Sequence, residues 1–376
     1  MQLGNRAVYE KDKRVVLTLD AGGTTLVFKA LQGGHEITET VTLPSIVDEL
    51  NPCLEQLVYG FRQVQEQIRG EVSAISFAFP GPADYKHGII GDLPNLPAFR
   101  GGVALGPFLS NAFDLPVFIN NDGNLFALGE FVFGFLPDTN QQIKRHGGTK
   151  QFKNLIGLTL GTGFGCGIVC GGQLLLGDNS NAAEIWLMRN KLRSDLCADA
   201  GVGKDKLRIF YAERSGLDLD EVPAPEVLYR IGKGEIPGDV EAACAAFTDM
   251  GQVIGDAVAN AACLVDGLVV IGGGISGAAE LFMPAVMEEL NGQIGHLHGV
   301  QLPRMPFQAN YLDDEMAIIA FSKGEQRVIG IPQSSKQITH DALPRIGVGL
   351  STLGVSRATA MGAYVYALHA AVKFKE

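Results

Sequence analysis

The stretch Leu17-Thr18-Leu19-Asp20-Ala21-Gly22-Gly23-Thr24-Thr25 is an apolar run that ends in one carboxylate, two glycines and two hydroxyls. This pattern is typical of a strand that leads into a phosphate-binding turn, because glycine lets backbone amides approach an anion without a Cβ in the way. Asp20 is placed to hold a hydrated Mg²⁺ beside the phosphates. The stretch therefore predicts a strand and a nucleotide-binding turn, whose contacts come from Gly22, Gly23, Thr24 and Thr25.

A second stretch of this kind, Leu158-Thr159-Leu160-Gly161-Thr162-Gly163-Phe164-Gly165-Cys166-Gly167, lies in the middle of the chain. It repeats the Leu-Thr-Leu strand end and the turn of glycine and threonine, but Gly161 stands where the first copy has Asp20. Either turn alone is also typical of a glycine-rich hairpin. Together they indicate two halves of a duplicated fold that close on one polyphosphate and one metal ion, the second half contributing Gly161, Thr162 and Gly163.

Size and composition describe an ordinary globular chain. Its 376 residues are 46% hydrophobic and 19% charged, which is length enough for two domains. The net charge of −11 argues against a nucleic-acid or anionic-membrane partner, because either needs a basic face. An anionic nucleotide is still allowed, since backbone amides and a metal ion can hold it locally.

The six cysteines are scattered and form no CxxC pair; they are Cys53, Cys166, Cys170, Cys197, Cys244 and Cys263. Several stand in apolar or alanine-rich runs, so we interpret them as small core residues in a reducing compartment. The first residues include no long apolar segment, and no run approaches the roughly 18 apolar residues of a membrane-spanning helix. A cytoplasmic protein is expected.

Hydrophobic periodicity and turn residues predict alternating strands and helices. The predicted strands cover 14–20, 25–31, 37–43, 74–79, 116–119 and 267–271, and the predicted helices cover 46–70, 103–113, 206–214, 241–264, 277–290, 316–323 and 359–368. Residues 137–153 are polar and locally basic, and we expect an exposed connection there. Residues 191–237 are irregular and carry no assignable chemistry.

Two loops are candidates for substrate binding. Pro80-Gly81-Pro82 follows a buried strand and directs the chain outward at its carboxyl end, where α/β proteins place ligands, so Gly81 is a candidate substrate contact. The proline-rich segment 91–99 is predicted to be a surface loop. Its Asn95 offers a donor and an acceptor that suit a sugar hydroxyl, although an Asx-type turn explains the residue equally well.

The segment Asn120-Asn121-Asp122-Gly123-Asn124 joins an apolar strand to a helix. A carboxylate delivered between amides at this point can accept a proton from a hydroxyl nucleophile, which makes Asp122 the candidate general base and Asn121 a candidate sugar contact. Helix N-capping is the structural alternative, because Asp and Asn are favoured caps. One cap accounts for one such residue, but not for four polar residues in five.

Two further sites belong to the second half of the chain. Glu184 ends a polar loop beside the only tryptophan, so it is a candidate pocket residue, although a carboxylate at a helix start also has a plain electrostatic explanation. The run Gly272-Gly273-Gly274-Ile275-Ser276 follows a predicted strand and precedes a helix. It is a candidate backbone contact for a nucleotide, here assigned to Gly273 and Gly274.

The motif order resembles the ROK family of bacterial sugar kinases and sugar-responsive repressors, within the actin-like ATPase superfamily. The resemblance covers nearly the whole chain and rests on Asp20-Ala-Gly-Gly-Thr, Pro80-Gly-Pro, Asn95-Leu-Pro, Asn121-Asp122-Gly-Asn, Gly161-Thr-Gly-Phe-Gly-Cys-Gly, Ala183-Glu184-Ile and Gly272-Gly-Gly-Ile. It implies an α/β fold of two ribonuclease-H-like domains that flank a cleft. Residues 1–133 with 355–376 would form the first domain, and residues 134–354 the nucleotide-binding one.

The resemblance also implies roles for individual residues. The residue that matches Asp122 is the base that activates the sugar hydroxyl, and those that match Asn121 and Glu184 bind the sugar. The turns that match Gly22-Gly23-Thr24 and Gly161-Thr162-Gly163 hold the phosphates of ATP. The glycines that match Gly272-Gly273-Gly274 lie near the adenosine.

The chain departs from the family pattern in two places. The family commonly has Gly-Glu-Ile-Gly-His followed by a three-cysteine zinc motif, whereas here the run is Ala183-Glu184-Ile185-Trp186-Leu187. No histidine lies between His146 and His296, and only Cys197 follows in the expected interval, so no structural zinc is expected. The repressor branch carries an N-terminal helix-turn-helix, for which few residues precede the first predicted strand, so DNA binding is not expected.

These features together predict an ATP- and Mg²⁺-dependent hexose kinase that acts as a homodimer. The chief alternative is a sugar sensor that keeps the cleft and signals to a partner, and a third is an acyl-phosphate kinase. Retention of Asp20 favours the enzyme over the sensor, and the amides at Asn95 and Asn121 suit a neutral polyol better than a carboxylate. The sequence leaves the hexose open between glucose, an N-acetylhexosamine and fructose.

Overall fold

The computed structural model describes residues 6–21, 25–46, 48–81, 83–91 and 97–373. The predicted phosphate contacts Gly22, Gly23 and Thr24, and the predicted sugar contact Asn95, lie outside the described residues. The chain divides into two compact units. The first comprises residues 1–137, 167–183 and 352–376, and the second comprises residues 138–166 and 184–351.

The first unit is built on a sheet of strand order β3-β2-β1-β5-β6, with β4 paired to β2. The strands are β1 (Val15–Ala21), β2 (Thr25–Gln32), β3 (His35–Glu36), β4 (Val41–Pro44), β5 (Val72–Ala78) and β6 (Val117–Asn120). β1 and β2 form the antiparallel hairpin expected around the first glycine turn. β1, β5 and β6 are parallel, so their carboxyl ends meet at one edge of the sheet.

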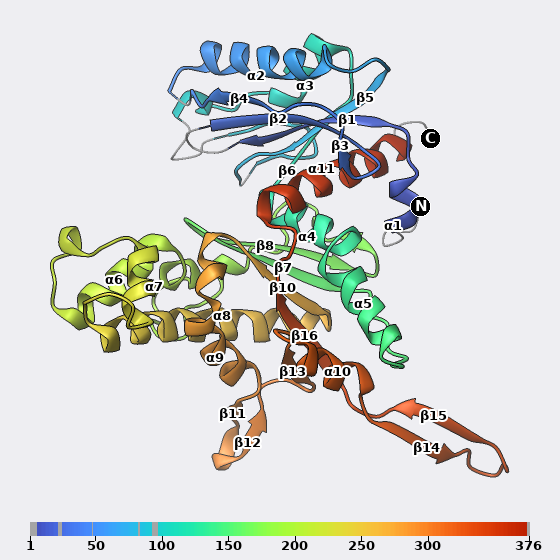
Figure 1. Cartoon of the computed structure of the whole chain (residues 1–376), viewed down its shortest axis with the longest axis vertical. Coiled ribbons are helices and arrows are strands. Elements are labelled where there is room, and N and C mark those ends of the chain that lie inside the picture. The colour runs from blue at the N-terminus through green and yellow to red at the C-terminus, as the bar shows by residue number, and fades with distance from the viewer. Residues whose placement is uncertain (1–5, 22–24, 47, 82, 92–96, 374–376) are drawn as a thin grey trace. The chain divides into compact units, whose positions relative to one another are not determined.

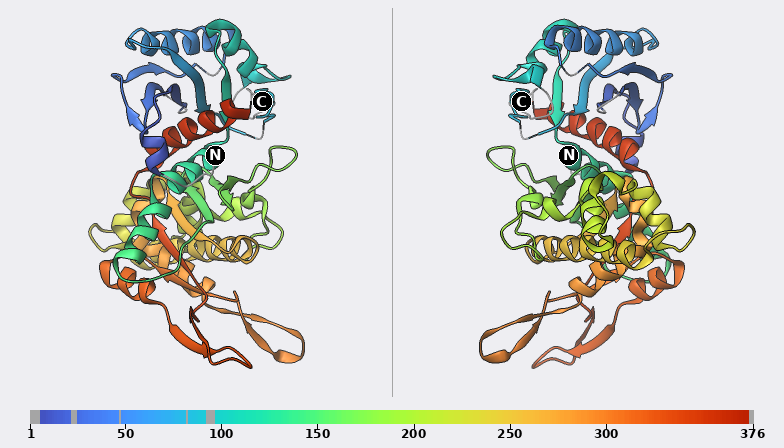
Figure 2. Two further views of the ribbon diagram at one scale, coloured as in Figure 1. Left: turned by 90° about the vertical axis from the view of Figure 1, so that its right-hand side faces the viewer. Right: turned by 90° about the vertical axis from the view of Figure 1, so that its left-hand side faces the viewer.

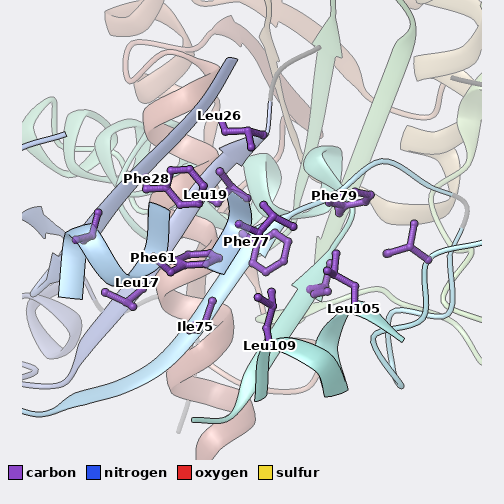
Figure 3. Packing of buried hydrophobic residues seen from close by; sticks show 14 of the residues in the cluster. Leu17, Leu19, Leu26, Phe28, Phe61, Ile75, Phe77, Phe79, Leu105 and Leu109 are labelled. Atoms are coloured by element: carbon purple, nitrogen blue, oxygen red, sulfur yellow. The ribbon is translucent and has the colours of Figure 1, made fainter. Parts of the chain in front are cut away.

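Helices cover both faces of this sheet. α2 (Leu50–Gln65) and α3 (Leu105–Phe113) lie on one face and α11 (Val355–Lys373) on the other, as Figure 1 shows. Between the strands and α2 and α3, apolar side chains form the core seen in Figure 3: Leu17, Leu19, Leu26, Phe28, Phe61, Ile75, Phe77, Phe79, Leu105 and Leu109. A short helix α1 (Arg6–Glu10) precedes β1, and a single 3-10 turn η1 (Pro97–Phe99) precedes α3.

α11 packs closely on α4 (Asp122–Val132), and glycines make this crossing possible. A Cβ on Gly362 would lie 1.8 Å from the carbonyl oxygen of Leu125, and one on Gly129 would lie 1.9 Å from that of Ala358. The backbones therefore approach to a distance that no larger residue allows. This contact holds the start of α4 and the start of α11 in the same unit.

The second sheet has the strand order β13-β16-β10-β7-β8-β9. Its strands are β7 (Leu155–Leu160), β8 (Phe164–Cys170), β9 (Gln173–Leu174), β10 (Leu268–Gly272), β13 (Gln308–Tyr311) and β16 (Arg345–Leu350). β7, β10, β16 and β13 run parallel to one another. The two glycine-rich turns that follow β7 and β10 therefore stand at the same sheet edge.

In the second unit, small side chains of the long α8 (Val240–Val265) pack against α9 (Ala279–Leu290). Further helices of this unit are η2 (Ile185–Leu187), η3 (Ala198–Gly201), α6 (Lys204–Ser215), η4 (Leu219–Glu221), α7 (Pro225–Gly232), η5 (Gly274–Ala278), η6 (Leu297–Gly299) and α10 (Glu315–Lys323). Two hairpins, β11 (Gln293–Gly295) with β12 (Gln301–Pro303) and β14 (Gln326–Gly330) with β15 (Gln337–Asp341), extend as narrow ribbons in Figure 2.

The expected α/β class is confirmed, but the prediction of an exposed connection over 137–153 is wrong in part. Residues Phe135–Arg145 form the helix α5, in which Ile143 is buried. Asp138 in its first turn and Lys144 and Arg145 in its last complement the helix dipole. In the described part of the chain, no helix combines the length and apolar character needed to cross a membrane.

Candidate active site

Asp20 lies near the carboxyl end of β1, at the edge where the parallel strands of the first sheet end. Its Oδ2 accepts a hydrogen bond of 2.5 Å from the Ser356 hydroxyl, which stands in the first turn of α11. Asp20 is partly exposed, so its other oxygen is available to water or to a metal ion. Ser356 therefore orients the predicted metal carboxylate, a role that the sequence did not reveal.

Asn121 and Asp122 stand at the same edge, directly after β6. Asn121 caps α4, since its Oδ1 accepts from the Gly123 amide at 2.8 Å. The Asp122 Oδ1 accepts from the same amide, also at 2.8 Å. The capping alternative thus holds for Asn121, whereas Asp122 lies in the first helical turn with its second carboxylate oxygen free of this contact.

A buried amide side chain, that of Asn120, stabilises the junction between β6 and α4. Asn120 is fully buried, and its Oδ1 accepts from the Asn121 amide at 2.8 Å and from Nδ2 of Asn124 at 3.0 Å. The polar residues of the run Asn120–Asn124 therefore have two different roles. Asn120 and Asn124 fix the backbone, and they leave Asn121 and Asp122 at the surface of the edge.

The pKa of the Asp122 carboxyl is raised above its ordinary value. The main cause is desolvation by the protein crowded around it, although the residue itself remains exposed to solvent; the negative charge of Asp20 adds to the rise. The Gly123 amide opposes it by stabilising the charged form. A raised pKa makes a carboxylate a better proton acceptor, which suits a general base.

Gly81 follows β5 at the same edge. A Cβ on this residue would lie 2.3 Å from the hydroxyl oxygen of Tyr85, and that hydroxyl donates to the Phe79 carbonyl at 2.9 Å. Tyr85 therefore fixes the loop from below, and Gly81 leaves room for it. Of the predicted sugar contacts in the first unit, the structure brings Gly81, Asn121 and Asp122 to one sheet edge.

The second phosphate turn, Gly161–Gly163, joins β7 to β8. The Gly161 amide donates to the Gly163 carbonyl at 3.1 Å, which closes the turn on itself. The Phe164 amide donates to Oδ1 of Asp199 at 2.9 Å, and Oδ2 of Asp199 forms an ion pair with Lys206 at 3.1 Å. Asp199 and Lys206 come from the segment to which the sequence assigned no chemistry, and no local pattern distinguishes them from surface charges.

Gly273 and Gly274 follow β10 beside this turn. Gly273 has φ of 106°, and a Cβ on it would lie 2.1 Å from the Leu160 carbonyl oxygen, so the end of β10 approaches the end of β7 closely. Gly274 faces open space. The Ser276 hydroxyl donates to the Gly273 carbonyl at 2.6 Å and tightens the loop. The structure thus brings the two predicted nucleotide contacts of the second unit together.

Glu184 stands just before η2, and its carboxylate accepts a hydrogen bond from the indole of Trp186. Burial, and next the charge of Glu184, raise the pKa of the Cys166 thiol, so the carboxylate lies near β8. The preceding Ala183 has φ of 64°, a left-handed conformation that disfavours a Cβ. The backbone therefore turns directly before Glu184.

The described residues also bear on the metal and the nucleotide. No group of three or more His, Cys, Asp or Glu side chains that could enclose a metal ion occurs among them. Mg²⁺ is commonly held by one or two carboxylates together with waters and substrate phosphates, so the partly exposed Asp20 fits that role. The amides of the Gly161–Gly163 turn fit a phosphate. The absence of a structural zinc stays a prediction.

The first sheet carries Asp20 and Asp122 at the ends of its parallel strands, and the second carries glycine-rich loops after β7 and β10, an arrangement typical of α/β proteins that bind phosphates. A comparison with known families agrees with this class: the model of the ROK family matches residues 16–318, and the chain belongs to that family.

The chain is also similar to individual proteins of known structure or assigned function. The solved structure of a glucokinase from Parabacteroides distasonis ATCC 8503 matches this chain with a TM-score of 0.87 and 47% identity, over 96% of this chain and 99% of that one. The glucokinase of Thermotoga maritima is 28% identical over 174 residues, which are 46% of this chain and 50% of that protein. A putative xylose repressor from Caldicellulosiruptor sp. is 30% identical over 174 residues, 46% of this chain and 38% of that protein. The match thus spans about half the length of most of the curated relatives.

Proposed function

We propose that this protein is an ATP-dependent sugar kinase that phosphorylates a hexose hydroxyl, with glucose as the favoured substrate. The observation that carries the proposal is the pair of carboxylates, Asp20 and Asp122, at one sheet edge of a ROK-family chain. Glucose is favoured because the solved structure that is 47% identical over nearly the whole chain is a glucokinase.

Asp122 is the general base of the proposed reaction. Its free oxygen accepts the proton of the sugar hydroxyl while the hydroxyl oxygen attacks the γ-phosphoryl group in line. The raised pKa supports this role, because a carboxylate of ordinary acidity takes up a hydroxyl proton less readily. Asn121, Gly81, Asn95 and Glu184 would hold the sugar. Positioning supplies most of the acceleration, since phosphoryl transfer needs little covalent help.

ATP and Mg²⁺ are the proposed cofactors. The glycine turns Gly22–Thr25 and Gly161–Gly163 would hold the phosphates through backbone amides, and Gly273 and Gly274 would lie near the adenosine. When bound, Mg²⁺ supplies positive charge to the phosphoryl oxygens. Asp20 would hold its water shell, with Ser356 fixing the carboxylate through the hydrogen bond to Oδ2.

The domain organisation belongs to the same proposal. Residues 1–133 with 355–376 and residues 134–354 would act as two ribonuclease-H-like domains with substrates in the cleft between them. Closure would exclude water from the phosphoryl group. A homodimer is also proposed, because the two hairpins of the second unit expose apolar side chains, among them Leu297 at 72% and Val328 at 61% exposure.

The direct test is a coupled ADP-release assay with ATP and Mg²⁺ over a panel of glucose, N-acetylglucosamine, N-acetylmannosamine and fructose. Glucose-dependent ADP formation, abolished by removing Mg²⁺ with EDTA, is the expected result. A higher kcat/KM for an acetamido sugar would correct the substrate but keep the reaction. No sugar-dependent ADP formation with any of the four would contradict the proposal.

A sugar sensor is the second candidate, favoured by the similarity to a putative xylose repressor. A sensor needs sugar binding without turnover. Calorimetry with glucose, run beside the ADP assay, separates the two functions. Binding without ADP release identifies the sensor, and binding with release identifies the kinase.

A further inference from the structure

We propose that Asp199 and Lys206 are positioning residues that hold the Gly161–Gly163 turn in the shape that receives a phosphate. The proposal rests on the nucleotide-binding role given to this turn above. It assigns a function to part of segment 191–237, which the sequence left without one. The residues act on the nucleotide through the backbone of the turn and need not touch it.

Asp199 connects the end of the turn to α6 through both of its oxygens. Oδ1 accepts the Phe164 amide at 2.9 Å, at the first residue after the turn. The same oxygen would lie 3.2 Å from a Cβ on Gly163, so the carboxylate packs directly against the turn. Oδ2 pairs with the Lys206 ammonium at 3.1 Å. The Asp199 side chain thus binds the backbone at the end of the turn and also pairs with Lys206.

The start of α6 completes this support. The Lys204 amide donates to the Gly161 carbonyl at 3.1 Å, and the Lys206 ammonium lies 3.5 Å from the Thr162 carbonyl oxygen. Gly203 has φ of 136°, and a Cβ on it would lie 2.6 Å from that Thr162 oxygen. The turn's outward carbonyls are therefore covered by the first residues of α6.

This arrangement leaves the amides of the turn for a ligand. Within the part of the chain that the structure describes, we find no acceptor for the Thr162 and Gly163 amides. Engaging the carbonyls on one side turns these N–H groups to the other side, which is the geometry of a backbone anion site. The α6 N-terminus has no side-chain cap, although Asp205 in its first turn partly offsets the positive end of the helix.

The ion pair matters here for its geometry more than for its Coulomb energy. Asp199 and Lys206 are 27% and 24% exposed, and partly exposed pairs contribute little to stability. The Asp199 charge also opposes a phosphate, so electrostatics alone predicts tighter nucleotide binding when it is removed. A positioning role predicts the reverse, and the sign of the effect decides between the two.

The experiment measures the Kd of AMP-PNP with Mg²⁺ by calorimetry for the parent and for Asp199→Asn, Asp199→Ala, Lys206→Gln and Lys206→Arg. Asp199→Asn keeps an acceptor for the Phe164 amide and loses the ion pair, so we expect Kd to rise about five-fold. Asp199→Ala loses both contacts, and we expect a rise of at least about ten-fold. Lys206→Arg keeps the charge, and its Kd should stay within about three-fold of the parent value.

Coupling between the two residues gives a stricter test. If they act as one unit, the double variant Asp199→Asn/Lys206→Gln binds no more weakly than the poorer single variant, because both singles already break the same contact. Lys191→Gln is the matched control. Lys191 pairs with Glu289 in the same unit and, among the described residues, has no hydrogen bond or ion pair with the turn, so its loss should leave Kd within two-fold.

Tighter or unchanged nucleotide binding by Asp199→Ala, with an unfolding midpoint close to that of Lys191→Gln, would overturn the proposal. A parent that binds AMP-PNP but phosphorylates no sugar would contradict the sugar-kinase function while leaving this inference to be decided by the variants. A parent that binds no nucleotide would overturn both. The KM for glucose should stay within about two-fold in all the variants, since the sugar contacts lie on other residues.

Discussion

Asp122 carries conflicting demands at a single residue. Its neighbours raise the pKa of its carboxyl above the ordinary value, chiefly by desolvation, so the folded protein holds this proton more tightly than the unfolded chain does. The ionised form that the proposed mechanism needs is therefore the form that the fold disfavours. Stability is lost as the pH rises through the ordinary pKa toward the folded one, and the loss persists at neutral pH.

Two results follow for Asp122→Asn. The variant should unfold at a higher midpoint than the parent at pH 7, and the difference should vanish below the ordinary carboxyl pKa, where both proteins are neutral at this position. Thermal scans at pH 7 and at acid pH measure this. If Asp122→Asn instead unfolds at a lower midpoint than the parent at pH 7, the desolvation of Asp122 does not reduce the free energy of unfolding.

The pH dependence of the parent's activity should also report the ionisation of Asp122. The proposed mechanism requires ionised Asp122, so log kcat/KM should fall with unit slope on the acid side, with an apparent pKa above the ordinary aspartate value. A pH profile between about 4 and 8, taken with a coupling system active over that range, measures it. A flat acid limb would assign the base to another group.

Ala183 shows strain beside a predicted sugar contact. Its φ of 64° costs an alanine roughly 1 kcal/mol, which glycine would not incur. Glycine also loosens the unfolded chain, so the comparison needs a control at a residue with ordinary backbone. We expect Ala183→Gly to have a free energy of unfolding about 1 kcal/mol above that of Ala182→Gly. Equal values in denaturant titrations would show that Ala183 is not strained.

At the scale of elements, glycine contacts between α4 and α11 place the active-site edge. α4 begins with Asp122, and α11 carries Ser356 in its first turn. The sequence predicted a helix over 359–368, near the C-terminus. The structure identifies α4 as its partner, and the close crossing explains why the small residues are needed.

Gly362→Ala should damage this crossing. The added methyl would lie 1.8 Å from a carbonyl oxygen of α4, and the helices must separate to accommodate it. Overpacking of this kind costs about 1–3 kcal/mol, and the shift should also lower kcat by moving the start of α4. Gly70→Ala is the matched control, because nothing lies within 4 Å of that position. Similar unfolding midpoints for the two variants would contradict the assigned packing.

Helices and strands that have a strong local sequence pattern were predicted, and those that depend on contacts distant in sequence were missed. The β1–β2 hairpin, β5, α8 and β10 have strong local patterns, and the sequence located them within a few residues. α5 was missed because its polar composition hides a narrow buried face at Ile143. β13 and β16 were missed because their strand character comes from pairing with each other, across residues distant in sequence.

At the scale of the whole molecule, each unit repeats one plan: parallel strands end at an edge, and a glycine turn or a carboxylate follows. The sequence revealed this plan because the residues predicted to contact a phosphate or a sugar, such as glycine, Asp and Asn, stand in recognisable runs directly after apolar strands. It did not reveal Ser356, Tyr85, Asp199 or Lys206, which act on those residues from distant elements. Such supporting residues carry no chemical signature until the chain is folded.

The measurement that tests the central claim most directly compares Asp122→Asn with the parent in two assays, glucose binding by calorimetry and glucose-dependent ADP release. The account predicts a glucose Kd within about two-fold of the parent and a kcat at least about 100-fold lower, as expected for loss of a general base. A kcat within a few-fold of the parent value, with glucose still bound, would contradict it.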